Sequence, residues 1–342
     1  SREGDYYFFF KNDGLQNQGI MYRQAGLDGT PEVFIDPNKL STDGTAALGG
    51  TSFSKTGKLV AFFVAQSGSD WQEIQVMDVK NRQLLNDKIR FVKFSGASWN
   101  GDEGFYYSRY PEPDEKSKLS KQNQFHQVYY HKVGTSQSED VLVYKDDAHP
   151  LRNVQAGLTD DGRFLVLSMS EGTSGSEVWV KDQTTGQKDF SLLVPGFATE
   201  PDVVDNKGAL LLVRTNDGAP NYKIVLVDPA SPDKKNWVTV IPEAKEVLQS
   251  VGTAGGFLFC SYLKDASTKV YQYTYDGKLV REIQLPGIGT AGGFGGKKED
   301  KEFFYTFTSY NTPPSVYRFN IETGVSTLFR KTETAFRSEL YE

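Results

Sequence analysis

The chain of 342 residues contains 23 Phe, 18 Tyr and 4 Trp, which is enough aromatic bulk for a large core and excludes a disordered protein. Its formal net charge of −6 gives no basic footprint for general nucleic-acid binding, and its single cysteine, Cys260, excludes an internal disulfide framework and a cysteine-rich zinc site. No apolar run approaches the ~18 residues that suggest a membrane span.

Seven times along the chain, a turn-forming segment is followed at once by an apolar run, which is typical of a hairpin that leads into a buried strand. The turns are Glu3-Gly4-Asp5, Thr56-Gly57-Lys58, Asn100-Gly101-Asp102, Asp161-Gly162-Arg163, Lys207-Gly208, Gly255-Gly256 and Glu299-Asp300-Lys301. The strands expected after them are 6–10, 59–64, 105–107, 164–167, 209–213, 257–262 and 303–307. The longest interval contains a charged insert, residues 112–124, which has no apolar periodicity.

A second series of seven polar turns alternates with the first, and each separates two further expected strands. These turns are Leu27-Asp28-Gly29, Val79-Lys80-Asn81, Val133-Gly134-Thr135, Thr184-Thr185-Gly186, 229–235, Tyr275-Asp276-Gly277 and Glu322-Thr323-Gly324. The chain therefore supplies about four strands in each of seven units of roughly 49 residues, a length typical of propeller blades.

The repeat predicts an all-β fold, a seven-bladed β-propeller with about four antiparallel strands per blade. The blades are expected to start near residues 4, 57, 101, 162, 208, 256 and 300 of a single domain over 1–342, with a linker tail at 331–342. An irregular β-sandwich is the alternative, but it has no reason to repeat its turns seven times. Residues 242–251 are expected to form a helical turn or two.

Sequence motifs of catalysis and phosphate binding are incomplete. The nearest approach to the Gly-x-Ser-x-Gly nucleophile elbow, residues 172–176, lacks the final glycine and falls in an expected blade loop. The glycine-rich segment 292–296 leads into another expected strand, whereas a phosphate site needs a helix N-terminus. We interpret it as a connection between blades, and we expect no catalytic residue and no cofactor in this chain.

Other chemistry-bearing residues are expected to be structural. His126 and His131 are five residues apart, and on one strand that spacing places them on opposite faces, which argues against a two-histidine metal site. Cys260 lies in an apolar segment and is expected to be a buried, inert thiol. The acidic pairs Glu139-Asp140 and Asp146-Asp147 are expected in solvated turns.

Several residue strings, found in order along essentially the whole chain, closely resemble the propeller of the prolyl oligopeptidase family. They include Gly14-Leu15-Gln16-Asn17-Gln18, Ile35-Asp36-Pro37-Asn38, Ser67-Gly68-Ser69-Asp70-Trp71, Lys93-Phe94-Ser95, Tyr129-Tyr130-His131, Gln137-Ser138-Glu139-Asp140 and Pro220-Asn221-Tyr222-Lys223. The resemblance implies a serine peptidase that cuts short peptides after proline. It also implies that the Ser–Asp–His triad lies in an α/β-hydrolase domain, which the propeller covers, and that the propeller ring closes without strand exchange.

The sequence departs from the family because the hydrolase domain is missing on both sides. We therefore expect the propeller domain alone, which gates and confines the substrate but is not itself an enzyme. The implied partners are the hydrolase domain and short proline-containing peptides, with no nucleic acid and no membrane, and the uncovered face is expected to self-associate. We expect a cytoplasmic location, with the periplasm left open. The alternative functions are a stand-alone scaffold that binds peptides or proteins and a propeller enzyme with its own carboxylate pair.

The resemblance also implies roles for four residues. Phe94 matches an aromatic residue of the pocket for the peptide residue two positions before the cleaved proline; an ordinary blade-core phenylalanine is the alternative. Asn153 falls near another pocket position. Thr173 falls where mammalian members carry a reactive cysteine, so the family's thiol sensitivity is expected to be lost there. Asp70 matches a carboxylate that faces a hydrolase arginine and is expected to be solvated without it, while Trp71 is expected to pack in the same loop.

Overall fold

The computed structural model describes residues 1–112 and 122–332. The chain forms two compact units, Ser1–Phe190 and Ser191–Glu342, which are described separately. Most of the charged insert expected at 112–124 and of the tail expected at 331–342 lies outside the described residues. Within these residues, no helix has the length and apolar character needed to cross a membrane.

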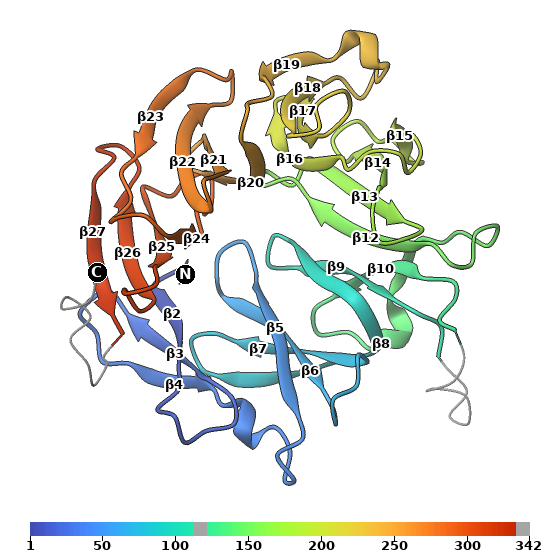
Figure 1. Cartoon of the computed structure of the whole chain (residues 1–342). Coiled ribbons are helices and arrows are strands. Elements are labelled where there is room, and N and C mark those ends of the chain that lie inside the picture. The colour runs from blue at the N-terminus through green and yellow to red at the C-terminus, as the bar shows by residue number, and fades with distance from the viewer. Residues whose placement is uncertain (113–121, 333–342) are drawn as a thin grey trace. The chain divides into compact units, whose positions relative to one another are not determined.

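The first unit consists of antiparallel sheets whose strands follow one another in chain order (Figure 1). The first sheet contains β1 (Arg2–Glu3), β2 (Tyr6–Lys11), β3 (Ile20–Ala25) and β4 (Glu32–Ile35), and the 3-10 helix η1 (Pro37–Lys39) follows it. A seven-stranded sheet contains β5 (Ala47–Phe53), β6 (Leu59–Ala65), β7 (Gln72–Asp78), β8 (Gln83–Asn100), β9 (Gly104–Arg109), β10 (Gln127–Lys132) and β11 (Val141–Tyr144), with η2 (Gln137–Glu139) before β11. A third sheet contains β12 (Asn153–Leu158), β13 (Phe164–Ser170), β14 (Glu177–Asp182) and β15 (Ser191–Val194), the last of which begins just after the boundary between the units.

The seven-stranded sheet is two blades that share the long strand β8. The first part of β8 pairs with β7 as far as Val92, and its last part pairs with β9 from Ala97 to Asn100. The ladder is interrupted between Val92 and Ala97; Phe94, within the interruption, has a positive φ angle of 52°, and Phe91, just before it, has one of 63°. Non-glycine residues rarely adopt this left-handed conformation, so the crossover needs its surroundings to hold it.

The second unit consists of three sheets with the same simple order of strands. One sheet contains β16 (Asp202–Lys207), β17 (Leu210–Thr215), β18 (Lys223–Val227) and β19 (Val238–Ile241), with the 3-10 helix η3 (Lys234–Asn236) before β19. The next contains β20 (Val247–Ala254), β21 (Phe257–Lys264), β22 (Ser267–Thr274) and β23 (Leu279–Ile283). The last contains β24 (Thr290–Gly292), β25 (Glu302–Thr308), β26 (Ser315–Asn320) and β27 (Ser326–Lys331). The described residues therefore form seven blades when β8 is counted in two of them.

The seven expected hairpins between first and second strands are all present, as are the seven polar turns between third and fourth strands. The predicted all-β propeller fold is therefore confirmed. Each described sheet is built from strands that are consecutive in the chain, and β27 pairs with β26.

The helical turn expected at 242–251 is wrong. Residues 242–246 are extended or bent, and Val247 already begins β20. The side-chain amide of Asn221 donates hydrogen bonds to the carbonyl groups of Ala244 and Lys245, which holds this segment away from a helical conformation.

The second strand of each blade is a nearly continuous apolar run because neighbouring sheets cover both of its faces. In β6, the side chains from Val60 to Val64 are all buried. Phe62 packs with Phe8 and Phe34 of the first sheet, whereas Phe63 packs with Ile89 and Phe105 on the other face. Layers of apolar side chains between successive sheets thus make the core of each unit.

A buried charged cluster joins the second and third blades. The His131 ring lies between two carboxylates, with Nε2 at 2.8 Å from Asp87 and Nδ1 at 2.7 Å from Asp140. Asp87 also accepts a hydrogen bond from the Gly134 N–H, and Asp140 accepts one from the Tyr107 hydroxyl. The expectation that Asp140 sits in a solvated turn is therefore wrong, because its side chain is only 1% exposed.

Candidate functional site

The four residues singled out from the sequence lie at one end of the blades of the first unit. We call this the loop end: there each first strand begins, and each second strand passes to the third. Asp70 lies in the β6–β7 loop, and Phe94 lies in the crossover of β8 just before the third blade begins. Asn153 is the first residue of β12, and Thr173 lies in the β13–β14 loop. The antiparallel order of the strands brings all four to the same end.

Phe94 is exposed, with 51% of its surface accessible, so the alternative of a blade-core phenylalanine is wrong. Its backbone is held in the crossover by neighbouring groups. The carbonyl of Phe94 accepts a hydrogen bond from the Gln155 side chain at 3.4 Å, and the Ser95 hydroxyl accepts one from the Ser108 N–H at 2.7 Å. The crossover therefore presents an aromatic ring to solvent from an ordered backbone.

Lys93 connects Phe94 to the β6–β7 loop. Its ammonium group lies 5.1 Å from the Phe94 ring centroid and 5.6 Å from that of Trp71, within the range of cation–π contacts. It also pairs with Asp70 at 3.3 Å. Asp70 is exposed, as expected, but it has this cation as a partner rather than water alone. Because the Asp70 carboxylate is well solvated, the pair contributes at most ~1 kcal/mol.

A stack of two rings fills the space between the crossover and β12. Tyr110 and His126 stack with their centroids 4.4 Å apart, and Trp71 meets Tyr110 edge-on at 6.0 Å. The Tyr110 hydroxyl donates to Oδ1 of Asn153 at 2.5 Å. Trp71 is thus a packing residue of its loop, as expected, and the stack links it to Asn153.

His126 is buried, and both of its ring nitrogens make hydrogen bonds. Nε2 lies 3.0 Å from the Lys93 carbonyl oxygen, and Nδ1 lies 3.1 Å from the backbone nitrogen of Val154. Burial lowers the pKa of His126 to about 4, although its hydrogen bond to the Lys93 carbonyl opposes this shift. Burial likewise raises the pKa of Tyr110 to about 12. Both rings are therefore neutral near pH 7.

The structure brings Asp70, Phe94 and Asn153 into one connected cluster but does not join Thr173 to it by a direct contact. Thr173 is exposed in the adjoining loop, three residues after Ser170, which pairs with Asn153 in the ladder. Sequence reasoning missed Lys93, Tyr110 and His126 as members of the cluster. No local pattern indicates them, because their contacts join segments that lie far apart in the sequence.

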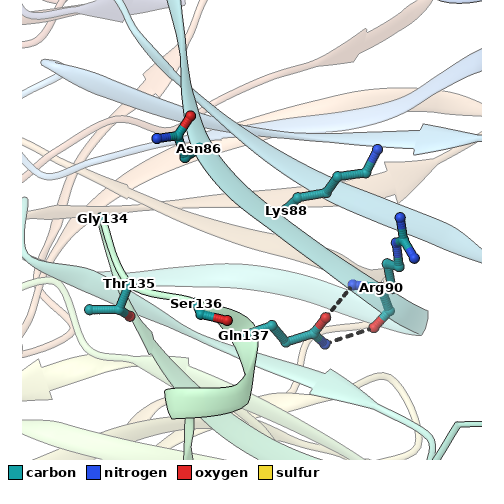
Figure 2. A pocket seen from close by; sticks show the side chains of 7 residues that line it. All are labelled: Asn86, Lys88, Arg90, Gly134, Thr135, Ser136 and Gln137. Atoms are coloured by element: carbon teal, nitrogen blue, oxygen red, sulfur yellow. Dashed lines mark hydrogen bonds between the residues drawn. The ribbon is translucent and has the colours of Figure 1, made fainter.

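An open groove of about 460 Å³ lies elsewhere in the first unit, along β8 and the turn before η2. Figure 2 shows the Gln137 side chain reaching the main chain of Arg90, with which it makes two hydrogen bonds. Lys88 and Arg90 both pair with Glu73. The two cations that line the groove therefore already have a carboxylate partner, and none of the four residues predicted from the sequence lines it.

In each unit, taken by itself, exposed apolar side chains also lie at the end of the blades where first strands begin and second strands pass to the third. They are Phe10, Leu15, Phe94, Phe125 and Leu151 in the first unit, and Val247, Leu263, Ile288 and Tyr310 in the second. Leu15 and Ile288 are 91% and 85% exposed. Among the described residues, the other exposed large apolar side chains lie on outer strands or in the β26–β27 turn, and none lies in a turn between first and second strands. This distribution is typical of a surface that contacts another molecule or domain.

The cluster offers aromatic and amide surface, together with one cation–carboxylate pair, for binding an extended ligand. It does not assemble a nucleophile with a general base. His126 has both nitrogens bound to the main chain, and the fully buried Cys260 thiol has its pKa raised to about 12 by burial. Across 1–112 and 122–332, no group of three or more His, Cys, Asp or Glu residues is arranged to hold a metal ion.

Comparisons with known proteins identify the fold family. A family model described as the prolyl oligopeptidase N-terminal β-propeller domain matches residues 1–332. A prolyl endopeptidase of Elizabethkingia miricola is 43% identical over 340 residues, which cover 99% of this chain and 48% of the relative. Prolyl oligopeptidase A of Galerina marginata is 31% identical over 349 residues, which cover 92% of this chain and 46% of that protein. The chain spans about half the length of these relatives.

Solved structures give the same result. A structure from a study of two prolyl endopeptidases and their inter-domain dynamics matches with a TM-score of 0.91 and 34% identity, covering 100% of this chain and 50% of that one. Prolyl oligopeptidase B from Galerina marginata, bound to a 25mer macrocyclization substrate, matches with a TM-score of 0.88 and 28% identity, covering 98% of this chain and 50% of that one.

Proposed function

Because the chain belongs to the N-terminal β-propeller family of the prolyl oligopeptidases, we propose that it is the non-catalytic, substrate-confining part of a serine peptidase. The full-length protein cleaves short peptides after proline, and the chemistry takes place in an α/β-hydrolase domain outside this chain. The observation that carries the proposal is the family match over residues 1–332, combined with relatives that are about twice as long as this chain.

The exposed apolar side chains at the loop end support this role. In the proposal, the hydrolase domain covers this end, so that Phe94 and Asn153 face the bound peptide and Asp70 faces the hydrolase domain. Thr173 borders the same space without supplying a thiol. The propeller then narrows access to the active site and surrounds the substrate with apolar walls, which excludes water and folded proteins.

Replacing Phe94 with alanine is expected to weaken selection of the peptide residue two positions before the proline. Partial burial of a phenylalanine ring against a ligand contributes about 1.5 kcal/mol, so kcat/KM for a Phe-Gly-Pro amide falls roughly tenfold in the full-length protein. A Gly-Pro amide lacks that residue and should be cleaved at an unchanged rate. Equal loss for both substrates would contradict the assignment of Phe94.

The chain alone is expected to hydrolyse no Gly-Pro amide above the rate of a heat-inactivated sample, whereas the full-length protein hydrolyses it. Light scattering on the same sample is expected to show dimers or larger species, because the loop end exposes apolar side chains. Hydrolysis by the chain alone would contradict the proposal. Saturable binding of peptides or proteins by a chain that has no catalytic half in the cell would favour a stand-alone scaffold.

A further inference from the structure

We propose that His126 is a positioning residue that holds Phe94 and Asn153 in the positions from which they contact the substrate peptide. The inference rests on the proposed function, because it assigns a role within the same substrate-facing cluster. His126 does not touch the substrate space itself: its side chain is buried, and it acts through the two backbone segments to which it is bound.

The two hydrogen bonds of His126 attach to the two segments that carry the proposed substrate-facing residues. Nε2 bonds to the carbonyl of Lys93, the residue immediately before Phe94. Nδ1 bonds to the N–H of Val154, the residue immediately after Asn153. These segments lie about 60 residues apart in the sequence, and the single imidazole ring spans the gap between them.

The donor and acceptor roles of the ring follow from these partners. A carbonyl oxygen only accepts and a backbone N–H only donates, so Nε2 carries the proton and Nδ1 accepts. Neutral imidazole satisfies both partners at once, whereas a phenylalanine satisfies neither and an amide side chain satisfies one of them. The imidazole ring therefore does more than fill space in the core: it supplies one donor for the Lys93 carbonyl and one acceptor for the Val154 N–H.

The crossover needs such a tether because of its backbone conformation. Phe94 has a positive φ angle of 52°, and its side chain is half exposed, so packing around the ring does little to hold it. The side chains of His126 and Gln155 bind the carbonyl groups of Lys93 and Phe94, and so tie this segment of the crossover to β12. Tyr110 stacks on His126 and binds the Asn153 side chain, which couples the same ring to the second substrate-facing residue.

The test uses the full-length protein and three variants that separate the two bonds. The amide nitrogen of His126→Gln replaces Nε2 and keeps the bond to Lys93, while the amide oxygen of His126→Asn replaces Nδ1 and keeps the bond to Val154. His126→Phe removes both bonds but retains a ring to stack on Tyr110. His149→Gln is the matched control, because His149 is half exposed and pairs only locally with Asp146.

The readout is the ratio of kcat/KM for a Phe-Gly-Pro amide to that for a Gly-Pro amide. We expect this ratio to fall roughly tenfold in His126→Asn and His126→Phe, which matches the Phe94→Ala variant, and to stay within about threefold of wild type in His126→Gln. Cleavage of the Gly-Pro amide, which lacks the peptide residue that Phe94 contacts, should fall less than cleavage of the Phe-Gly-Pro amide. Combining His126→Phe with Phe94→Ala should give no further loss, because both changes remove the same interaction.

Each other outcome has a defined meaning. An unchanged ratio in the His126 variants, with a lowered ratio in Phe94→Ala, overturns the role of His126 and leaves the proposed function standing. Equal loss for both substrates, or failure of all three His126 variants to fold, assigns His126 a purely structural role and also overturns the inference. A ratio that Phe94→Ala does not change contradicts the substrate-facing assignment on which the inference depends.

Discussion

Replacing His131 with phenylalanine is expected to lower the free energy of unfolding of this chain by about 3–5 kcal/mol, measured by urea denaturation at pH 7. The His131 side chain is fully buried between Asp87 and Asp140, whose side chains are 0% and 1% exposed. Removing the imidazolium leaves two buried carboxylates without their cation. The cost comes mainly from these unpaired charges, not from the change in side-chain shape.

The same cluster predicts a pH dependence with a definite sign. Burial alone disfavours the charged ring, but the hydrogen bonds and charges of Asp140 and Asp87 outweigh it and raise the pKa of His131 to about 9, from its ordinary value near 6.5. A group whose pKa is raised on folding stabilises the protein fully below pH 6.5, and this contribution is lost as the pH rises through about 9. The shift corresponds to about 3 kcal/mol, at roughly 1.4 kcal/mol per pKa unit.

Two comparisons isolate the effect of His131. Between pH 6.5 and 9, the difference in unfolding free energy between wild type and His131→Phe should shrink by about 3 kcal/mol. His149→Gln removes a half-exposed histidine and should change the unfolding free energy by less than ~0.5 kcal/mol. A His131→Phe protein with wild-type stability at both pH values would show that the three groups do not form a charged cluster in solution.

Replacing Gly252 with alanine is expected to destabilise the chain by about 3 kcal/mol or to prevent folding. Gly252 lies in β20, and a Cβ atom there would lie 2.9 Å from the Phe294 carbonyl carbon and closer still to its oxygen. That backbone cannot easily retreat, because Gly296 and Lys297 are hydrogen-bonded to the β20–β21 hairpin. The absence of a side chain at Gly252 lets the last two blades approach closely.

Gly157 is the matched control for Gly252. It also lies in the first strand of its blade, β12, but a Cβ atom there would meet no heavy atom within 4 Å. Gly157→Ala should therefore change the unfolding free energy by no more than about 1 kcal/mol. Equal destabilisation by the two substitutions would contradict the close contact between β20 and residues 294–295.

The fold could be predicted from the sequence because its signals are local. Glycines in the hairpins adopt the positive φ that the turns require, as at Gly57 and Gly162, both with φ of 74°. The apolar second strands follow directly, and the repeat of this pattern identifies the blades. Cys260 could be assigned to a buried strand for the same reason, and it is fully buried in β21.

The contacts within the site could not be predicted, because they depend on tertiary proximity. Asp140 belongs to a polar run that favours a solvated turn, yet the adjacent strands of its own blade, β9 and β10, place Tyr107 and His131 against its carboxylate. The sequence around His126 predicts only a histidine at the start of a strand, because its partners in the β8 crossover and in β12 lie far away in the sequence. The local sequence likewise does not show that two blades share β8. The strand is interrupted near Phe94 because its first part pairs with β7 and its last part pairs with β9.

The most direct test of the central claim is the size and reactivity of the native polypeptide in its source cell, probed with an antibody to this chain. If the chain is the propeller of a larger serine peptidase, as we propose, the antibody will detect a band well above 38.2 kDa that also reacts with a fluorophosphonate. A band at 38.2 kDa that takes no label would contradict this account and would direct attention to the propeller as an independent binding protein.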